Sequence, residues 1–96
     1  MTEIEKLDAA LIEMNISHEN VIRPMGGGDM IIAYGVRFGT KYLFYAICNK
    51  FSYGGRNGLL EVSGKWLIGN RGVVGRLTAD DVVKLINKKL EEKNNG

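Results

Sequence analysis

Cysteine, histidine and long apolar runs are scarce in this sequence, and each shortage excludes a class of protein. Cys48 is the only cysteine and His18 the only histidine, so no internal disulfide and no zinc site of repeated cysteine and histidine can form. The apolar runs are far shorter than the roughly 20 residues of a membrane span. The N-terminus also lacks the basic-then-apolar order of a signal peptide. We therefore expect a soluble cytoplasmic protein that does not enter a membrane.

What the sequence does contain is the composition of an ordinary globular protein. Of its 96 residues, 45% are hydrophobic and 25% are charged, which matches average usage. A chain of this size buries roughly 65% of its unfolded surface around one core. We expect a single domain spanning residues 1–96.

Helical patterns stand at both ends of the sequence. Thr2 and Glu5 have the spacing of a capping box, and apolar residues then recur at helical spacing, predicting a helix to about Asn15. Near the other end, Thr78 precedes two aspartates, which favour the first turn of a helix. The buried stripe of this second helix is expected to contain Val82, Val83, Ile86 and Leu90.

Between the helices the apolar spacing changes to alternation, which is typical of strands. The segment "MIIAYGVRFGTKYLFYAICN" predicts a hairpin whose two-residue turn is Gly39 and Thr40. Its register places Ile32 opposite Ile47 on a core face of larger residues. The reverse face is rich in small residues and is expected to be exposed, where it offers a surface for a homodimer.

The resulting fold class is α+β, an antiparallel sheet of three to five strands with N-terminal and C-terminal helices packed on one face. Val21 to Pro24 is expected as an edge strand and Leu59 to Ser63 as another. Glycines interrupt the segment "GKWLIGNRGVVG", for which we expect a loop with one short strand.

Charge is unevenly distributed along the chain. Residues 1–19 sum to −4, residues 77–96 to zero, and residues 20–76 to +6. A positive region of this kind attracts anionic ligands or acidic protein surfaces. The alternative is an ordinary solvated surface.

Catalytic candidates are few. His18 is expected on a turn at the surface, and Cys48 as a small hydrophobic residue rather than a nucleophile. Asp29 and Glu61 are the only acids between residues 21 and 76, and nothing in the sequence supports a paired-carboxylate site between them. We therefore expect no catalytic residues, no metal site, no cofactor and no enzymatic activity.

Two glycine-rich segments have the composition of a binding surface. "KFSYGGRNG" at residues 50–58 offers rings for stacking and cations, and "GNRGVVG" offers backbone amides beside two arginines. The alternatives are a hairpin loop that covers the sheet and a plain turn. The predicted ligand-binding residues are Lys50, Phe51, Tyr53, Arg56, Arg71 and Arg76.

The order "SYGGRNGLLEVSG" followed by "GVVGRLTADDVVKLI" resembles small accessory proteins carried by phages and prophages of low-GC Gram-positive bacteria. The resemblance covers about residues 50–90. It implies a phage-encoded protein in the host cytoplasm that counters host defence or redirects host machinery, and it brings no catalytic residues.

Three hypotheses of function follow. The first is a non-enzymatic protein that sequesters an anionic ligand, such as a nucleotide-derived signal. The second is an inhibitor that binds a host defence or housekeeping protein, in the manner of an anti-CRISPR protein. The third is nucleic-acid binding, for which the charge is modest and no motif is present.

Overall fold

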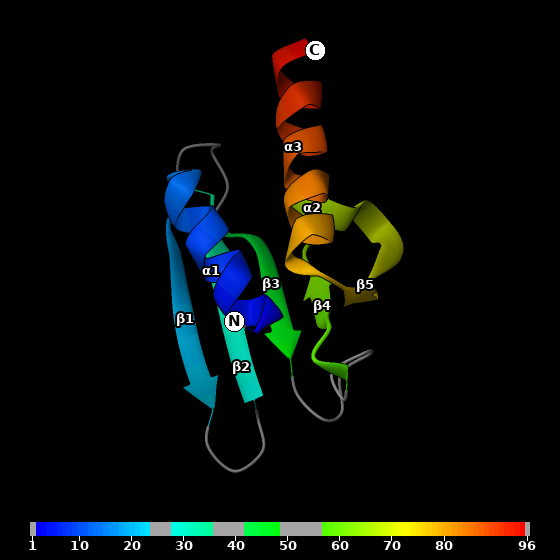
Figure 1. The fold of residues 1–96 in the computed structure, drawn as a ribbon. Helices are drawn as coiled ribbons and strands as arrows, with labels where there is room; N and C mark the ends of the chain where they lie inside the picture. The colour runs from blue at the N-terminus through cyan, green and yellow to red at the C-terminus, as the bar shows by residue number, and fades with distance from the viewer. Residues whose placement is uncertain (1, 24–27, 36–41, 49–56, 96) are drawn as a thin grey trace.

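The fold is a five-stranded antiparallel sheet with helices at both ends of the chain (Figure 1). The computed structural model describes residues 2–23, 28–35, 42–48 and 57–95. The sheet order is β1-β2-β3-β4-β5, so each strand lies beside its neighbour in sequence. The elements in order are α1 (Glu3–Glu13), β1 (His18–Arg23), β2 (Gly28–Tyr34), β3 (Tyr42–Cys48), β4 (Leu60–Ser63), α2 (Lys65–Ile68), the 3-10 turn η3 (Gly69–Arg71), β5 (Val73–Leu77) and α3 (Ala79–Asn95).

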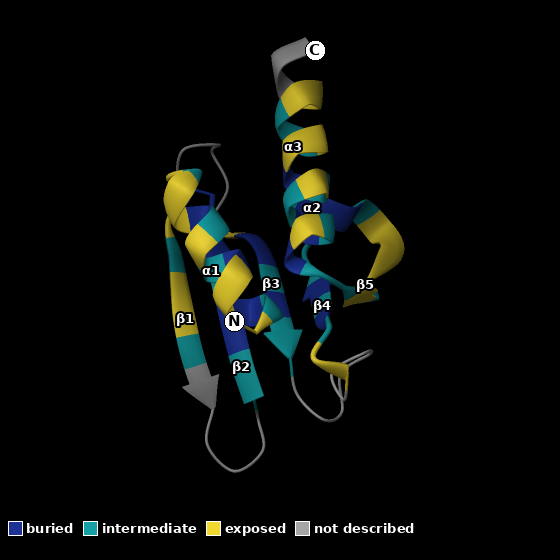
Figure 2. Cartoon of the chain, in the orientation of Figure 1, coloured by how far each residue is buried: buried dark blue, intermediate teal, exposed yellow. Residues whose placement is uncertain are grey.

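The core lies between the sheet and the helices, and Figure 2 colours its buried residues dark blue on both. α1 contributes Ile4, Leu7 and Leu11, and α3 contributes the apolar stripe that the sequence predicts. The sheet contributes Ile31, Ala33, Phe44, Ala46, Leu60 and Val62, all fully buried. The α+β class with both terminal helices on the sheet is therefore confirmed.

Both predicted helix starts are confirmed by reciprocal capping bonds. The Glu5 N–H donates to Thr2 Oγ1 at 3.2 Å, and the Thr2 N–H donates to Glu5 Oε1 at 3.3 Å. At α3, the Asp81 N–H donates to Thr78 Oγ1 at 3.2 Å and the Thr78 N–H donates to Asp81 Oδ2 at 2.9 Å. These bonds satisfy amides that a helix start leaves without partners. α1 ends at Glu13, two residues before the predicted end.

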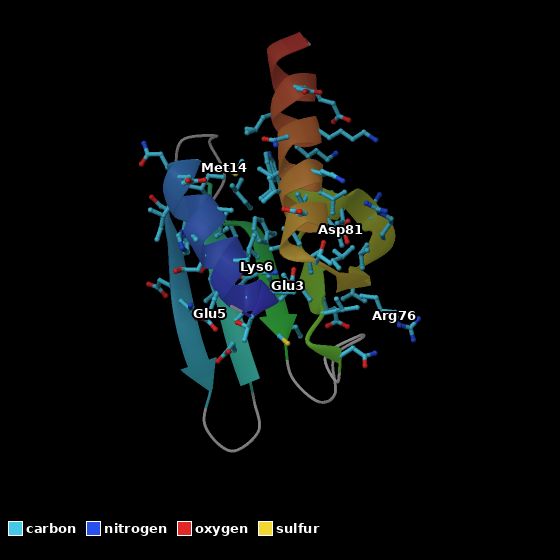
Figure 3. The ribbon with its side chains drawn as sticks, viewed as in Figure 1. Glu3, Glu5, Lys6, Met14, Arg76 and Asp81 are labelled. Atoms are coloured by element: carbon cyan, nitrogen blue, oxygen red, sulfur yellow. The ribbon has the colours of Figure 1, made fainter. Side chains whose placement is uncertain are left out.

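A carboxylate joins the two terminal helices. Glu3 Oε1 accepts a hydrogen bond from the backbone N–H of Ala79 at 2.8 Å, while its Oε2 lies 3.0 Å from Lys6 Nζ. Figure 3 shows Glu3 on the side of α1 that faces the start of α3. The Ala79 amide, and then Lys6, hold the pKa of Glu3 below its ordinary value. The first turn of α1 is thus tied to the first turn of α3.

The predicted hairpin register and core face are wrong. Ile32 pairs with Tyr45 rather than Ile47, and the register shifts between Ala33 and Tyr34. The register differs from the prediction by two residues, and such a shift keeps each side chain on the same face of the sheet. The wrong choice of the buried face is therefore a separate error. The helices cover the side of Ala33 and Ala46, which also carries Ile31 and Phe44.

This correction changes two earlier expectations. The small-residue side is the buried core, so it offers no exposed surface for a homodimer. The larger residues, including three tyrosines, lie on the opposite side of the sheet. The predicted turn at Gly39 and Thr40 lies outside the described residues.

The glycine-rich segment before α3 contains more structure than a loop. It forms α2 and η3 before the expected short strand, which is β5. Gly64 makes this possible: its φ is 138°, and a Cβ built there would lie 2.7 Å from the Phe44 Cα and 2.8 Å from the Leu43 carbonyl oxygen. The chain thus turns directly against β3, which brings Leu67 and Ile68 into the core.

Candidate functional site

A groove lies between β5 and the first half of α3. It has a volume of about 450 Å³, and we call it the β5–α3 groove. Sites for small molecules fall in the range of about 300–1,000 Å³. Its lining residues are Arg71, Val74, Leu77, Asp81, Lys84, Leu85 and Lys88.

The groove combines an apolar floor with a charged rim because of how two elements present their side chains. On α3, Asp81, Lys84, Leu85 and Lys88 recur at three- and four-residue spacing and share one face of the helix. On β5, Val74 pairs with Val62 and Leu77 pairs with Leu60, so both point to the core side of the sheet. The edge of the core thus becomes the floor of the groove.

Arg71 enters the groove from η3. Its Nε donates to the carbonyl oxygen of Ile68 at 3.1 Å, which fixes the base of the guanidinium group. The side chain also lines a smaller neighbouring hollow of about 140 Å³, which shares Leu85 and Lys88 with the groove. A guanidinium group presents several donors in one plane and suits phosphate or carboxylate oxygens.

Among the described residues that line the groove, Asp81 is the one acid, and together they carry a net charge of +2 from three cations and one carboxylate. Its carboxylate is already engaged at the start of α3. The backbone N–H of Thr78, then its hydroxyl, and last the nearby charge of Lys84 hold the pKa of Asp81 below its ordinary value. Of the lining side chains that the structure describes, the one carboxylate that could neutralise the rim cations is therefore already engaged in capping α3.

The predicted site residues divide into three groups. Arg71 lines the groove. Arg76 is exposed on β5, has a positive φ of 59° and extends away from Asp81 in Figure 3; it is not among the lining residues of the groove. The remaining predicted residues lie outside the described residues, and they are Lys50, Phe51, Tyr53 and Arg56.

The sequence prediction missed Lys84 and Lys88. Both were counted only in the neutral charge sum of the last segment, although each supplies a cation to the groove. Their shared spacing with Asp81 and Leu85 was the available signal, because it defines a second stripe of α3 beside the buried one. That β5 lies against this stripe depends on the tertiary fold.

The prediction that His18 lies on a surface turn is wrong. It begins β1, and its side chain is only 8% exposed. Nε2 lies 2.7 Å from Asp8 Oδ1, and Nδ1 lies 2.8 Å from the carbonyl oxygen of Ile16. His18 therefore connects β1 to α1.

The other reactive residues that the structure describes do not converge on one site. Asp29 pairs with Cys48, whereas Glu61 pairs with Ile47, so the two acids lie on opposite faces of the sheet. Partial burial, and then the charge of Asp29, raises the pKa of the Cys48 thiol, which disfavours the nucleophilic thiolate. Within the part of the chain that the structure describes, no three His, Cys, Asp or Glu side chains form a metal-binding group. Among the same residues, no helix is long and apolar enough to cross a membrane.

Comparisons with protein-family models, with curated proteins and with solved structures each find no match for this chain. The chemistry of the β5–α3 groove is therefore the basis on which a function is assigned.

Proposed function

We propose that this protein binds and sequesters a small anionic ligand with an apolar or aromatic portion, without catalysing its conversion. The observation that carries the proposal is the β5–α3 groove, in which Arg71, Lys84 and Lys88 surround an apolar floor. The floor accommodates a flat or aliphatic group through burial of apolar surface. The three cations bind phosphate or carboxylate oxygens.

A nucleotide-derived signal has both of these chemical features. Its base or sugar would cover Val74, Leu77 and Leu85, and its phosphates would lie along the rim. The resemblance to phage accessory proteins implies a protein that counters host defence or redirects host machinery. Sequestration of such a signal would be one way to counter host defence, and it requires only affinity.

The first test is native mass spectrometry of protein purified gently from its source cells, followed by titration of a panel of nucleoside phosphates. We expect a retained small molecule that contains phosphate, and we expect its affinity to fall as salt is raised. A protein that carries no small molecule and binds no member of the panel would contradict the proposal.

Two arginines provide a matched pair of variants. Arg71→Ala and Arg76→Ala each remove one positive charge from an exposed position, but only Arg71 lines the groove. Charge-assisted hydrogen bonds contribute about 1.5–3 kcal/mol, so Arg71→Ala should weaken binding by about tenfold or more. Arg76→Ala should change it little. Equal losses from both variants would show that the overall positive field, rather than the groove, attracts the ligand.

A further inference from the structure

The smaller hollow that Arg71 also lines lies where α2 is beside α3 (Figure 1). We call it the α2–α3 hollow. Its volume of about 140 Å³ is below the range of about 300–1,000 Å³ that holds a whole small molecule. A space of this size therefore suits one compact chemical group that belongs to a larger ligand.

The hollow and the β5–α3 groove adjoin each other along α3. Arg71, Leu85 and Lys88 line both of them. On α3 the lining of the groove begins at Asp81, and the lining of the hollow continues to Glu92. At a rise of about 1.5 Å per residue, this stretch of helix is roughly 16 Å long. The groove and the hollow thus form one elongated depression, in which Arg71 and Lys88 border both parts.

Arg71 is anchored where it can serve both parts of the depression. Its Nε donates to the carbonyl oxygen of Ile68 at 3.1 Å, and Ile68 lines the hollow but is not among the lining residues of the groove. The two terminal nitrogens of the guanidinium group carry its other N–H donors. Because these donors lie in one plane and form a fork, they can bind oxygens of two neighbouring anionic groups.

The charge of the hollow favours an anionic group. Among the described residues that line it, Arg71, Lys88 and Lys89 are cations and Glu92 is the one acid. Glu92 Oε2 lies 3.4 Å from Lys89 Nζ, and the two side chains are 55% and 33% exposed. An exposed ion pair of this kind contributes little to stability. An anionic group that enters the hollow can therefore replace Glu92 as the partner of Lys89.

We propose, on the basis of the function proposed for the groove, that its ligand carries two consecutive phosphates, as a nucleoside diphosphate does. The apolar portion covers the floor of the groove. The first phosphate lies at Arg71 and Lys88, where the groove and the hollow meet, and the second phosphate enters the hollow and reaches Lys89. A nucleoside monophosphate does not reach the hollow and binds more weakly.

The test is isothermal titration calorimetry of the full chain with the monophosphates and diphosphates of adenosine, guanosine, cytidine and uridine. For the nucleoside that binds best, we expect the diphosphate to bind about three- to tenfold more tightly than the monophosphate. Equal affinities would overturn the assignment of the second phosphate and leave the proposed function standing. No binding by any of these nucleotides would overturn both.

A matched pair of variants separates the hollow from general attraction of charge. Glu92→Gln and Glu91→Gln each remove one negative charge from an exposed position on α3, but only Glu92 is among the lining residues of the hollow. Glu92→Gln releases Lys89 and should tighten diphosphate binding by about two- to fivefold, with little effect on the monophosphate. Glu91→Gln should change both affinities little. Equal tightening by the two variants would overturn the proposal.

Lys89→Ala is the opposite perturbation. Lys89 lines the hollow and is not among the lining residues of the groove. Because alanine is a good helix former, we expect the variant to fold, which circular dichroism checks. It should weaken diphosphate binding by about three- to tenfold and monophosphate binding much less. An unchanged preference for the diphosphate would place the second phosphate outside the hollow and overturn the proposal.

Discussion

Gly64 provides the sharpest test of how the fold positions the groove. Its φ of 138° lies in a region that residues with a side chain rarely adopt. A methyl group there would meet backbone atoms of Leu43 and Phe44 rather than the end of a flexible side chain. The start of α2 must therefore move away from β3 to remove this clash.

The expected magnitude of Gly64→Ala combines two terms. Placing alanine in such a backbone conformation costs about 1–3 kcal/mol, and forcing extra volume into a packed contact costs about 1–3 kcal/mol more. The total of about 2–6 kcal/mol is a large part of the roughly 5–15 kcal/mol that stabilises a typical domain. Gly58→Ala is the control, because its φ is 76° but its added Cβ would have nothing within 4 Å. This control should cost about 1–2 kcal/mol.

Urea denaturation followed by circular dichroism measures both variants. We expect the midpoint of Gly64→Ala to fall much further than that of Gly58→Ala, with a similar slope for the two. Since α2 leads into the turn that holds Arg71, Gly64→Ala should also weaken ligand binding in the fraction that remains folded. A similar loss of stability in both variants would refute the close approach of Gly64 to β3.

Three further predictions concern the links between elements. Glu3→Gln should destabilise the protein most near neutral pH, because the Ala79 amide lowers the pKa of Glu3 in the folded state. The stability that the Glu3 carboxylate contributes is therefore present above its ordinary pKa of about 4.5 and is lost as the pH falls through its folded-state pKa. Denaturation curves that show an equal effect of the variant from pH 3 to 7 would contradict this. A double-mutant cycle of His18→Ala and Asp8→Ala should give a coupling of about 1–3 kcal/mol, whereas additivity within about 0.5 kcal/mol would show that their 2.7 Å contact contributes nothing. Thr78→Ala should lower the midpoint of urea denaturation, because losing the α3 cap costs about 1 kcal/mol. An unchanged midpoint would argue against the cap.

The parts of the fold that the sequence predicted depend on interactions within a few residues. Thr2 with Glu5, and Thr78 with Asp81, are pairs at three-residue spacing, so their capping bonds follow from local chemistry. The apolar stripes of α1 and α3 have the same origin. The choice between the two faces of the sheet was harder, because both faces of β2 and β3 are apolar. Which of the two faces the helices cover is decided by tertiary packing.

The candidate site was less predictable because its residues come from separate elements. Arg71 was identified from its glycine-rich surroundings, but Lys84 and Lys88 belong to a helix whose charges balance in sequence. Arg76 is five residues from Arg71, yet the backbone at its positive φ directs it elsewhere. α2 was missed because its position depends on Gly64 fitting against β3, a contact that no local pattern encodes.

The hydrogen bond between Glu3 and Ala79 has a consequence for how the protein is made. It joins residues 76 positions apart, and the core that it borders needs Val82 and Ile86 from the last helix. During synthesis α1 emerges first but cannot complete its packing until α3 has been translated. Contacts of such long sequence separation slow folding, and the sheet meanwhile exposes the apolar surface that α3 later covers. We expect the nascent chain to acquire protease resistance only after the whole of α3 has been released.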